Sequence, residues 1–297
     1  MRRSFAIASL AGLALWLSAC SPLRALNALV PDDGYAAHRD IAYGPDARQA
    51  LDVYSPVDAA GPAPVVVFFY GGSWKYGSRW QYEFVAEALT ERGYVAVVPD
   101  YRVYPEATFP AFVADGAGAL RWVRDHIAGY GGDPERIYLM GHSAGAYITA
   151  LLSLDPRYLA AEGLPRGTIR GMVGLSGPYA FNPLEYDSVR AIFAGHPEPE
   201  DLRPINFADA SAPPMLLLHG GDDGTVYPAN SRALADRVEA AGGEAEYVEI
   251  ADTGHIAIVL ALAKPFRRDG GVFDTAMAFI DLREHQLAPH RASLSAR

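Results

Sequence analysis

The sequence predicts an α/β protein in which a mostly parallel, eight-stranded sheet carries helices on both of its faces. Hydrophobic runs alternate along the chain with segments of helical period, which is typical of strand–helix units. The run at 65–70 holds six consecutive apolar or aromatic residues, as expected of a strand buried on both faces. No internal repeat is visible in the 297 residues, and no domain boundary follows residue 35. A single domain over 36–286 is therefore expected.

The expected strands are short apolar runs, and the first two form an antiparallel pair around a Gly-Pro-Asp turn. They are 39–43, 49–54, 65–70, 95–98, 137–140, 172–175, 215–218 and 246–250. Helices are expected at about 80–92, 110–128, 144–154, 229–241 and 271–284. The Pro-rich stretch 177–212 has no period and is expected to be an insertion over the sheet edge and the active site. Residues 287–297 are expected to be a frayed tail.

Composition excludes several classes of protein. Half of the residues are hydrophobic and 20% are charged, which is ample for a globular core. The 35 acidic and 25 basic side chains give a formal net charge of −10, and no basic run indicates nucleic-acid binding. Cys20 is the single cysteine, so an intramolecular disulfide and a thiolate metal cluster are both excluded. We expect neither a metal nor an organic cofactor.

The first 19 residues have the pattern of an export signal. Two arginines precede an apolar run at 5–17 that is short for a membrane span. The run ends in Leu-Ser-Ala before Cys20, which resembles the lipobox of bacterial lipoproteins. The resemblance implies removal of 1–19, lipidation of Cys20 and a tether over 20–35. Because Ser21 follows the cysteine, it also implies the periplasmic face of the outer membrane of a Gram-negative bacterium.

A turn suited to a nucleophilic serine lies at 141–145, which reads Gly-His-Ser-Ala-Gly between an expected strand and an expected helix. Glycines are needed on both sides, because side chains there would collide with the strand and the helix. The helix that follows directs free N–H groups toward developing negative charge. Ser143 is therefore the predicted nucleophile; the alternative is a turn that merely contains a serine.

A serine hydroxyl needs a base and an acid, which follow this kind of turn in the order acid, then histidine. His255 is the predicted base, because its loop follows the expected strand 246–250 at the carboxyl edge of the sheet. His219 ends a strand and is predicted to be structural, and His142 is expected to point away from the serine. The remaining downstream histidines lack a supporting context; they are His196, His285 and His290.

Two neighbouring aspartates, Asp222 and Asp223, follow the expected strand 215–218 and qualify as the acid by position. Local physics does not separate them, because either can instead close the loop as an Asx turn. Asp252 is a third and weaker candidate, because it lies three residues before His255 on the same loop.

The loop at 70–74 reads Tyr-Gly-Gly-Ser-Trp and is the expected second source of oxyanion donors. Paired glycines let a backbone approach the substrate and turn its N–H groups inward. The alternative is a plain tight turn. The predicted oxyanion hole consists of Gly71, Gly72, Ser73 and Ala144.

Five segments together resemble the α/β-hydrolase superfamily, in particular the carboxylesterases related to hormone-sensitive lipase and the alkylformamidase-like esterases. They are 70–74, 99–106, 141–145, 219–226 and 254–255, and the resemblance covers about residues 40–284. The family pattern His-Gly-x-x-Asp-x-x-Val implies that Asp223 is the acid. The family loop usually begins with a supporting histidine where this chain has Tyr70, so substrate access is expected to differ. A similar Tyr-Gly-Gly-Ser-Trp loop occurs in prenylcysteine methylesterases, whose substrate is not carried over.

The resemblance implies a serine hydrolase that cleaves carboxylic esters through an acyl-enzyme, with Ser143, Asp223 and His255 as its triad. Short-chain or aromatic esters are the expected small-molecule substrates. The predicted pocket residues are Trp74, Tyr101, Tyr104, Tyr179 and Phe181. The alternatives are an amidase or peptidase on the same fold and a non-catalytic binding protein on a hydrolase scaffold.

Lipidation predicts that a clickable fatty acid fed to expressing bacteria labels the protein, and that Cys20→Ala abolishes the label. The matched control is Ser21→Ala, which leaves the acceptor thiol in place. An ordinary secretory signal or a twin-arginine signal without lipidation would instead give an unlabelled wild type.

Overall fold

The structure is a computed structural model that describes residues 26–27, 30–31, 33–268 and 270–294. The expected signal at 1–19 and the expected lipidation site Cys20 lie outside these residues. Within the described part of the chain, no helix is long and apolar enough to cross a membrane.

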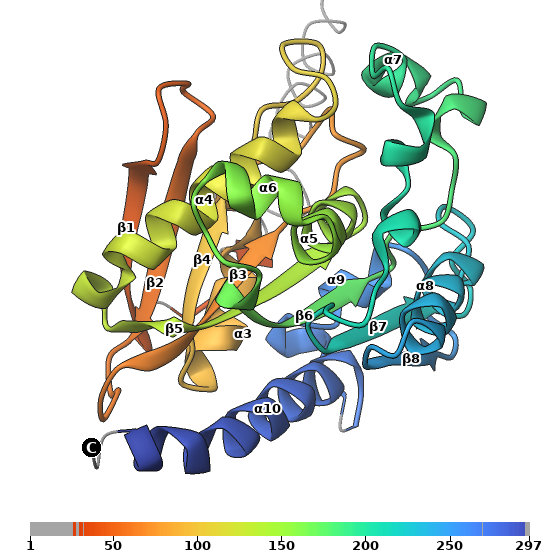
Figure 1. Cartoon of the computed structure of the whole chain (residues 1–297). Coiled ribbons are helices and arrows are strands. Elements are labelled where there is room, and N and C mark those ends of the chain that lie inside the picture. The colour runs from red at the N-terminus through yellow and green to blue at the C-terminus, as the bar shows by residue number, and fades with distance from the viewer. Residues whose placement is uncertain (1–25, 28–29, 32, 269, 295–297) are drawn as a thin grey trace, which may run out of the picture.

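In the described residues, eight strands form one sheet in the order β1-β2-β4-β3-β5-β6-β7-β8 (Figure 1). The pairs β1–β2 and β2–β4 are antiparallel, and all other neighbouring strands are parallel. The predicted fold class is therefore confirmed. The strands are β1 Tyr35–Ala42, β2 Ala50–Pro56, β3 Ala63–Phe69, β4 Val95–Pro99, β5 Gly132–His142, β6 Ile169–Leu175, β7 Met215–Gly220 and β8 Ala245–Ile250.

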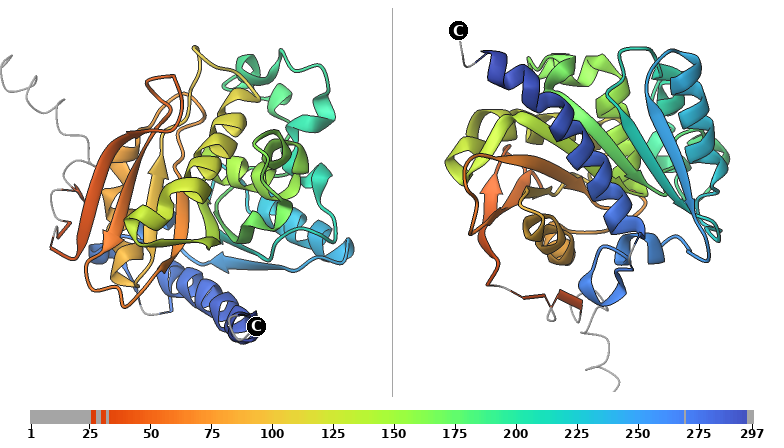
Figure 2. Two further views of the ribbon diagram at one scale, coloured as in Figure 1. Left: turned by 60° about the vertical axis from the view of Figure 1, so that its left-hand side comes forward. Right: turned by 90° about the horizontal axis from the view of Figure 1, so that it is seen from below.

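Helices cover both faces of the sheet. Figures 1 and 2 show α4 and α5 on one face and α3 and α10 on the other. The α-helices are α3 Glu83–Glu91, α4 Ala111–His126, α5 Ala144–Leu154, α6 Pro156–Ala161, α7 Arg190–Phe193, α8 Ala229–Ala240, α9 Ala257–Leu260 and α10 Val272–Leu294. The 3₁₀ turns are η1 Arg79–Tyr82, η2 Ile127–Tyr130, η3 Arg166–Thr168, η4 Pro183–Glu185, η5 Pro199–Leu202, η6 Pro204–Phe207 and η7 Lys264–Phe266.

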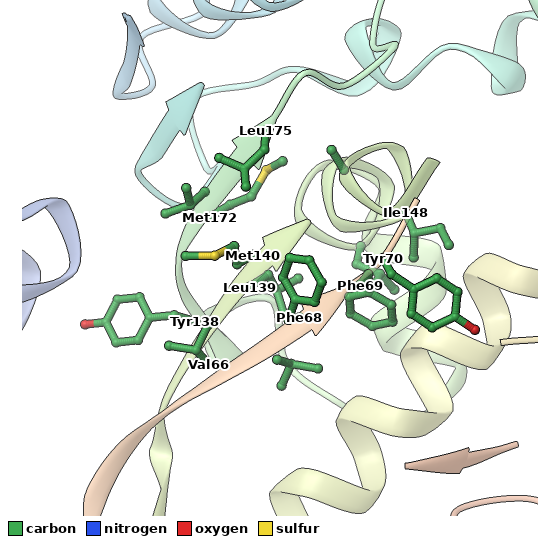
Figure 3. Close-up of a cluster of buried hydrophobic side chains, with 14 of the residues drawn as sticks. Val66, Phe68, Phe69, Tyr70, Tyr138, Leu139, Met140, Ile148, Met172 and Leu175 are labelled. Atoms are coloured by element: carbon green, nitrogen blue, oxygen red, sulfur yellow. The ribbon is translucent and has the colours of Figure 1, made fainter. Parts of the chain in front are cut away.

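The central strands are apolar on both faces because both faces are covered. Phe68 and Phe69 are neighbours in β3, so their side chains project to opposite sides of the sheet, yet both are fully buried. Figure 3 shows Phe69 near Ile148 of α5, and Leu139 of β5 within the same cluster. Each such buried side chain contributes about 1.5–3 kcal/mol of hydrophobic stabilisation. This core holds the carboxyl ends of β3, β5 and β6 rigidly side by side.

Most expected strands and helices differ from the structure by a few residues at their ends, and β5 begins five residues before the expected 137. Three differences concern the expected tether, tail and insertion. β1 begins at Tyr35, at the end of the expected tether 20–35. α10 continues to Leu294, so residues 287–294 of the expected tail are helical; no glycine follows Gly271 to end the helix. The expected insertion 177–212 contains η4, α7, η5 and η6, which are too short to show a helical period.

Leu139→Ala is expected to lower the free energy of unfolding by about 2–5 kcal/mol, because removing this fully buried side chain of β5 leaves a cavity in the core. Leu282→Ala is the matched control; Leu282 is 52% exposed, so a change within about 0.5 kcal/mol is expected. Urea denaturation measures both. Equal losses for the two variants would contradict the assignment of the core.

Candidate active site

Ser143 lies on the sharp turn between β5 and α5, with φ 54° and ψ −120°. Non-glycine residues rarely adopt a positive φ, so the surrounding structure must enforce it. The Ser143 N–H donates to the carbonyl oxygen of Leu175 at 2.9 Å. A Cβ at Gly141 would come within 2.6 Å of the Gly145 backbone, and one at Gly145 within 2.0 Å of the Phe69 carbonyl oxygen. Both glycines are therefore required for the approach of α5 to the strands.

A chain of hydrogen bonds joins Ser143, His255 and Asp223, which come from three loops. The Ser143 hydroxyl lies 2.9 Å from His255 Nε2, and His255 Nδ1 lies 2.7 Å from Asp223 Oδ2. Because a carboxylate only accepts, Nδ1 carries the proton and Nε2 is left to accept from the serine. The sequence predicted these three side chains.

Asp223 is buried, whereas the neighbouring Asp222 is exposed. Asp223 Oδ1, the oxygen that does not face His255, accepts the N–H groups of Thr225 and Val226, both at 2.9 Å. Asp223 therefore also closes its own loop. Burial by itself raises the pKa of Asp223, but the hydrogen bonds from His255 and Val226 outweigh it and hold the pKa below its ordinary value. The carboxylate therefore stays charged beside the histidine.

His219 supports the Asp223 loop from below. It is fully buried, with Nδ1 2.7 Å from the Ser231 hydroxyl and Nε2 2.8 Å from the Val226 carbonyl oxygen. Burial lowers its pKa, so the ring is neutral and donates from Nε2. This structural position agrees with the prediction. His196 and His285 are not brought to Ser143; they contact Asp201 and the Asp281 carbonyl oxygen.

His142 precedes the serine and is also buried. Its Nε2 lies 2.9 Å from the carbonyl oxygen of His255, and the two rings are 4.9 Å apart. Burial, together with the neighbouring His255, lowers the pKa of His142 to about 3. The sequence predicted only that His142 points away from Ser143. It did not predict the contacts of the ring with His255 and Gly71, because those segments are distant in the chain.

The loop after β3 has the tight geometry expected of an oxyanion loop. Gly72 has a φ of 131°, and Ser73 and Trp74 have φ of 53° and 57°. The Gly72 carbonyl oxygen accepts the N–H groups of Lys75 and Tyr76, both at 3.0 Å. Within the described residues, the N–H groups of Gly72 and Ser73 donate to no other protein group. These donors are therefore available beside the serine, as is the N–H of Ala144 at the start of α5.

A buried carboxylate fixes both ends of this loop. Asp100 Oδ1 accepts the Tyr70 hydroxyl at 2.5 Å and the Arg79 N–H at 2.7 Å. Arg48 donates to the Tyr70 hydroxyl at 3.0 Å and to the Gly77 carbonyl oxygen at 2.9 Å. Tyr70 thus supports the loop where relatives of the resembled family usually carry histidine.

A pocket of about 140 Å³ borders Ser143, Ser73 and Ala144. Trp74 and Phe181 line it as predicted, and their rings stack at 6.2 Å. Sequence reasoning missed several lining residues, for which the chain gives no local signal. They come from the insertion, from the loop before α8 and from the first turn of α8. They are Tyr186, Val189, Tyr227 and Asn230.

Three predicted pocket residues lie elsewhere. Tyr101 is fully buried and donates its hydroxyl to the Tyr70 carbonyl oxygen at 2.8 Å. Tyr179 is fully buried, with its hydroxyl only 1.9 Å from where a Cβ at Gly174 would lie. Tyr104 donates its N–H to the Trp74 carbonyl oxygen at 2.8 Å and does not border the pocket. Motif spacing marks such aromatic residues but does not say whether a ring faces core or pocket.

Among the described residues, no group of three or more His, Cys, Asp or Glu side chains is placed to hold a metal ion.

Comparisons with known proteins identify esterases. The family model BD-FAE matches residues 51–238. A probable isoprenylcysteine alpha-carbonyl methylesterase of Arabidopsis thaliana is 33% identical, covering 86% of this chain and 67% of that protein. Esterase LipC of Mycobacterium tuberculosis is 33% identical, covering 74% of this chain and 60% of that protein. The chain thus spans about two thirds or less of the length of these relatives.

Solved structures show the same fold. Esterase 2 of Thermogutta terrifontis has a TM-score of 0.67 and 26% identity, covering 87% of this chain and 94% of that chain. Esterase B of Lactobacillus rhamnosis has a TM-score of 0.78 and 19% identity, covering 94% of this chain and 96% of that chain. The second likeness concerns the fold alone.

The buried, neutral His142 makes stability dependent on pH. Its pKa is about 3 in the folded chain against an ordinary 6.5, so between these values the unfolded chain binds a proton that the folded chain does not. The free energy of unfolding therefore falls as the pH decreases from 6.5 toward 3. His142→Gln is expected to reduce this slope by about 1.4 kcal/mol per pH unit. Urea denaturation between about pH 4 and 7 measures it, with the exposed His126→Gln as control. An unchanged slope would contradict the burial of a neutral ring.

Proposed function

Because this chain belongs to the BD-FAE family and its relatives mark it as a carboxylesterase-type hydrolase, we propose that it cleaves carboxylic esters through an acyl-enzyme on Ser143. His255 Nε2 accepts the hydroxyl proton as Ser143 Oγ attacks the ester carbonyl. The alcohol leaves with that proton, and water, deprotonated by the same histidine, then releases the acid. Asp223 keeps the His255 ring in the tautomer that can accept the proton.

The single observation that carries this proposal is the hydrogen-bonded chain from Ser143 through His255 to the buried Asp223, with distances of 2.9 and 2.7 Å. A serine without such a base is a weak nucleophile. Since the pKa of Asp223 is held low, its charge stabilises the imidazolium that forms during attack.

Stabilisation of the tetrahedral oxyanion is assigned to the N–H groups of Gly72, Ser73 and Ala144. The first two lack a protein partner within the described residues, and the third begins α5. Donors that are fixed before reaction cost no reorganisation at the transition state.

Short-chain or aromatic esters are the proposed substrates. The pocket beside Ser143 is about 140 Å³, whereas pockets for drug-sized ligands are roughly 300–1,000 Å³. Its walls include the stacked rings of Trp74 and Phe181, which favour an apolar or planar acyl group.

We also propose that the protein is exported and lipid-anchored at Cys20 on the periplasmic face of an outer membrane. The lipobox-like segment before Cys20 supports this proposal.

Purified protein is expected to hydrolyse p-nitrophenyl acetate and butyrate faster than longer esters or a matched anilide, and to react with a fluorophosphonate probe. Ser143→Ala should lower kcat by on the order of 10⁶-fold, because the nucleophile acts together with its base. A wild type that neither labels nor turns over would favour the binding-protein alternative. Anilide turnover equal to ester turnover would favour the amidase.

The two neighbouring aspartates provide a matched pair. Asp223→Asn is expected to lower kcat by about 10⁴-fold, because the amide favours the wrong histidine tautomer. Asp222→Asn changes an exposed side chain and should stay within a few-fold of the wild type. If steady-state kinetics showed the larger loss of kcat for Asp222→Asn, the catalytic acid would instead be Asp222.

A further inference from the structure

His142 contacts both functional loops around the serine. It lies at the end of β5, directly before Ser143, and is 3% exposed. On one side it meets the His255 loop, which follows 113 positions later in the chain. On the other side it meets the loop after β3 at Gly71.

The contact with the His255 loop is a directed hydrogen bond. His142 Nε2 lies 2.9 Å from the carbonyl oxygen of His255. A carbonyl oxygen only accepts, so Nε2 carries the proton and donates. The ring therefore holds the backbone of the very residue whose side chain faces Ser143.

The opposite edge of the ring packs against Gly71. A Cβ at Gly71 would lie 2.9 Å from His142 Nδ1 and 3.0 Å from the Ser143 Cβ. The Nδ1 atom is buried and has no hydrogen-bond partner within the described residues. The ring is neutral, in agreement with its low pKa, so it adds no positive charge that would oppose protonation of His255.

The His255 loop needs such a restraint. Asp252 has a φ of 51°, and both Asp252 and Ile256 are exposed. Backbone hydrogen bonds from Asp222 and Ile258 hold the carbonyl oxygens of Thr253 and Gly254, but neither reaches His255 itself. Asp223 holds the tip of the His255 side chain at Nδ1, but it does not fix the backbone from which the side chain extends. A second hydrogen bond, at the His255 carbonyl oxygen, holds the backbone and so defines the direction from which His255 Nε2 approaches Ser143.

We propose that His142 is a positioning residue that aligns the general base: its Nε2–H holds the His255 carbonyl oxygen while its other edge abuts Gly71. This inference rests on the proposed function, since it concerns the same reaction. One buried side chain thus sets the spacing between the base loop and the oxyanion loop. A residue that only filled space would need no donor at Nε2.

Two amide substitutions at His142 distinguish a hydrogen-bond donor to the His255 carbonyl oxygen from a side chain that only fills space. In His142→Gln, the amide nitrogen reaches about as far as Nε2 and can donate to the His255 carbonyl oxygen. In His142→Asn, the same group is one methylene shorter and cannot. Steady-state hydrolysis of p-nitrophenyl acetate, fluorophosphonate labelling rates and thermal melts are measured for both variants and for the wild type.

His142→Gln is expected to keep kcat within about three-fold, whereas His142→Asn loses roughly 10- to 100-fold in kcat with KM nearly unchanged, because the base is misplaced. Fluorophosphonate labelling should likewise slow little in His142→Gln and strongly in His142→Asn. Val97→Ala, in the buried part of β4, is the stability control: its melting temperature falls while kcat holds.

Any of three results overturns the inference. The first is that His142→Asn retains the wild-type kcat, and the second is that the kcat of His142→Gln falls as far as that of His142→Asn. A kcat loss that Val97→Ala reproduces at equal melting temperature also overturns it. A wild type that neither hydrolyses the ester nor labels contradicts the proposed function itself, and the inference falls with it. An active wild type beside an equally active His142→Asn removes the inference alone.

Discussion

The close approach of α5 to the central strands is the constraint on which the rest of the site depends. At Gly145 a Cβ would come within 2.0 Å of the Phe69 carbonyl oxygen, so α5 begins almost in contact with the end of β3. This proximity forces Ser143 into its positive φ and raises the hydroxyl above the sheet edge. The strain persists because parallel pairing of β5 with both neighbours and the bond to Leu175 leave the turn no other path.

Around that turn, two uncharged buried histidines hold Asp223 and His255 in place. His142 and His219 are both buried, and burial lowers the pKa of each, so each offers one N–H to a backbone carbonyl oxygen. Those carbonyl oxygens belong to His255 and to Val226 of the Asp223 loop. Asp223 and His255 are thereby fixed without adding charge near the serine, where an extra cation would disfavour protonation of the base.

The oxyanion loop is held by a buried carboxylate instead of by uncharged rings. Asp100 is a buried carboxylate that accepts from Tyr70 at one end of the loop and from Arg79 at the other. A buried charge without partners is costly, so the pairing and the loop conformation depend on each other. Tyr70 reaches this carboxylate through its phenol, which explains how the loop keeps its shape without the histidine usual in the resembled family.

The sequence by itself determined the fold class and the two side chains whose position follows from a strand end, Ser143 and His255. Such positions are readable because parallel strands end at one edge and only glycine fits beside the serine. The choice of Asp223 over Asp222 needed the family pattern, and the structure agrees through burial. Tertiary structure alone decided which aromatic rings reach the pocket and what His142 contacts. These are directions of side chains between segments far apart in the chain, and local spacing carries no information about them.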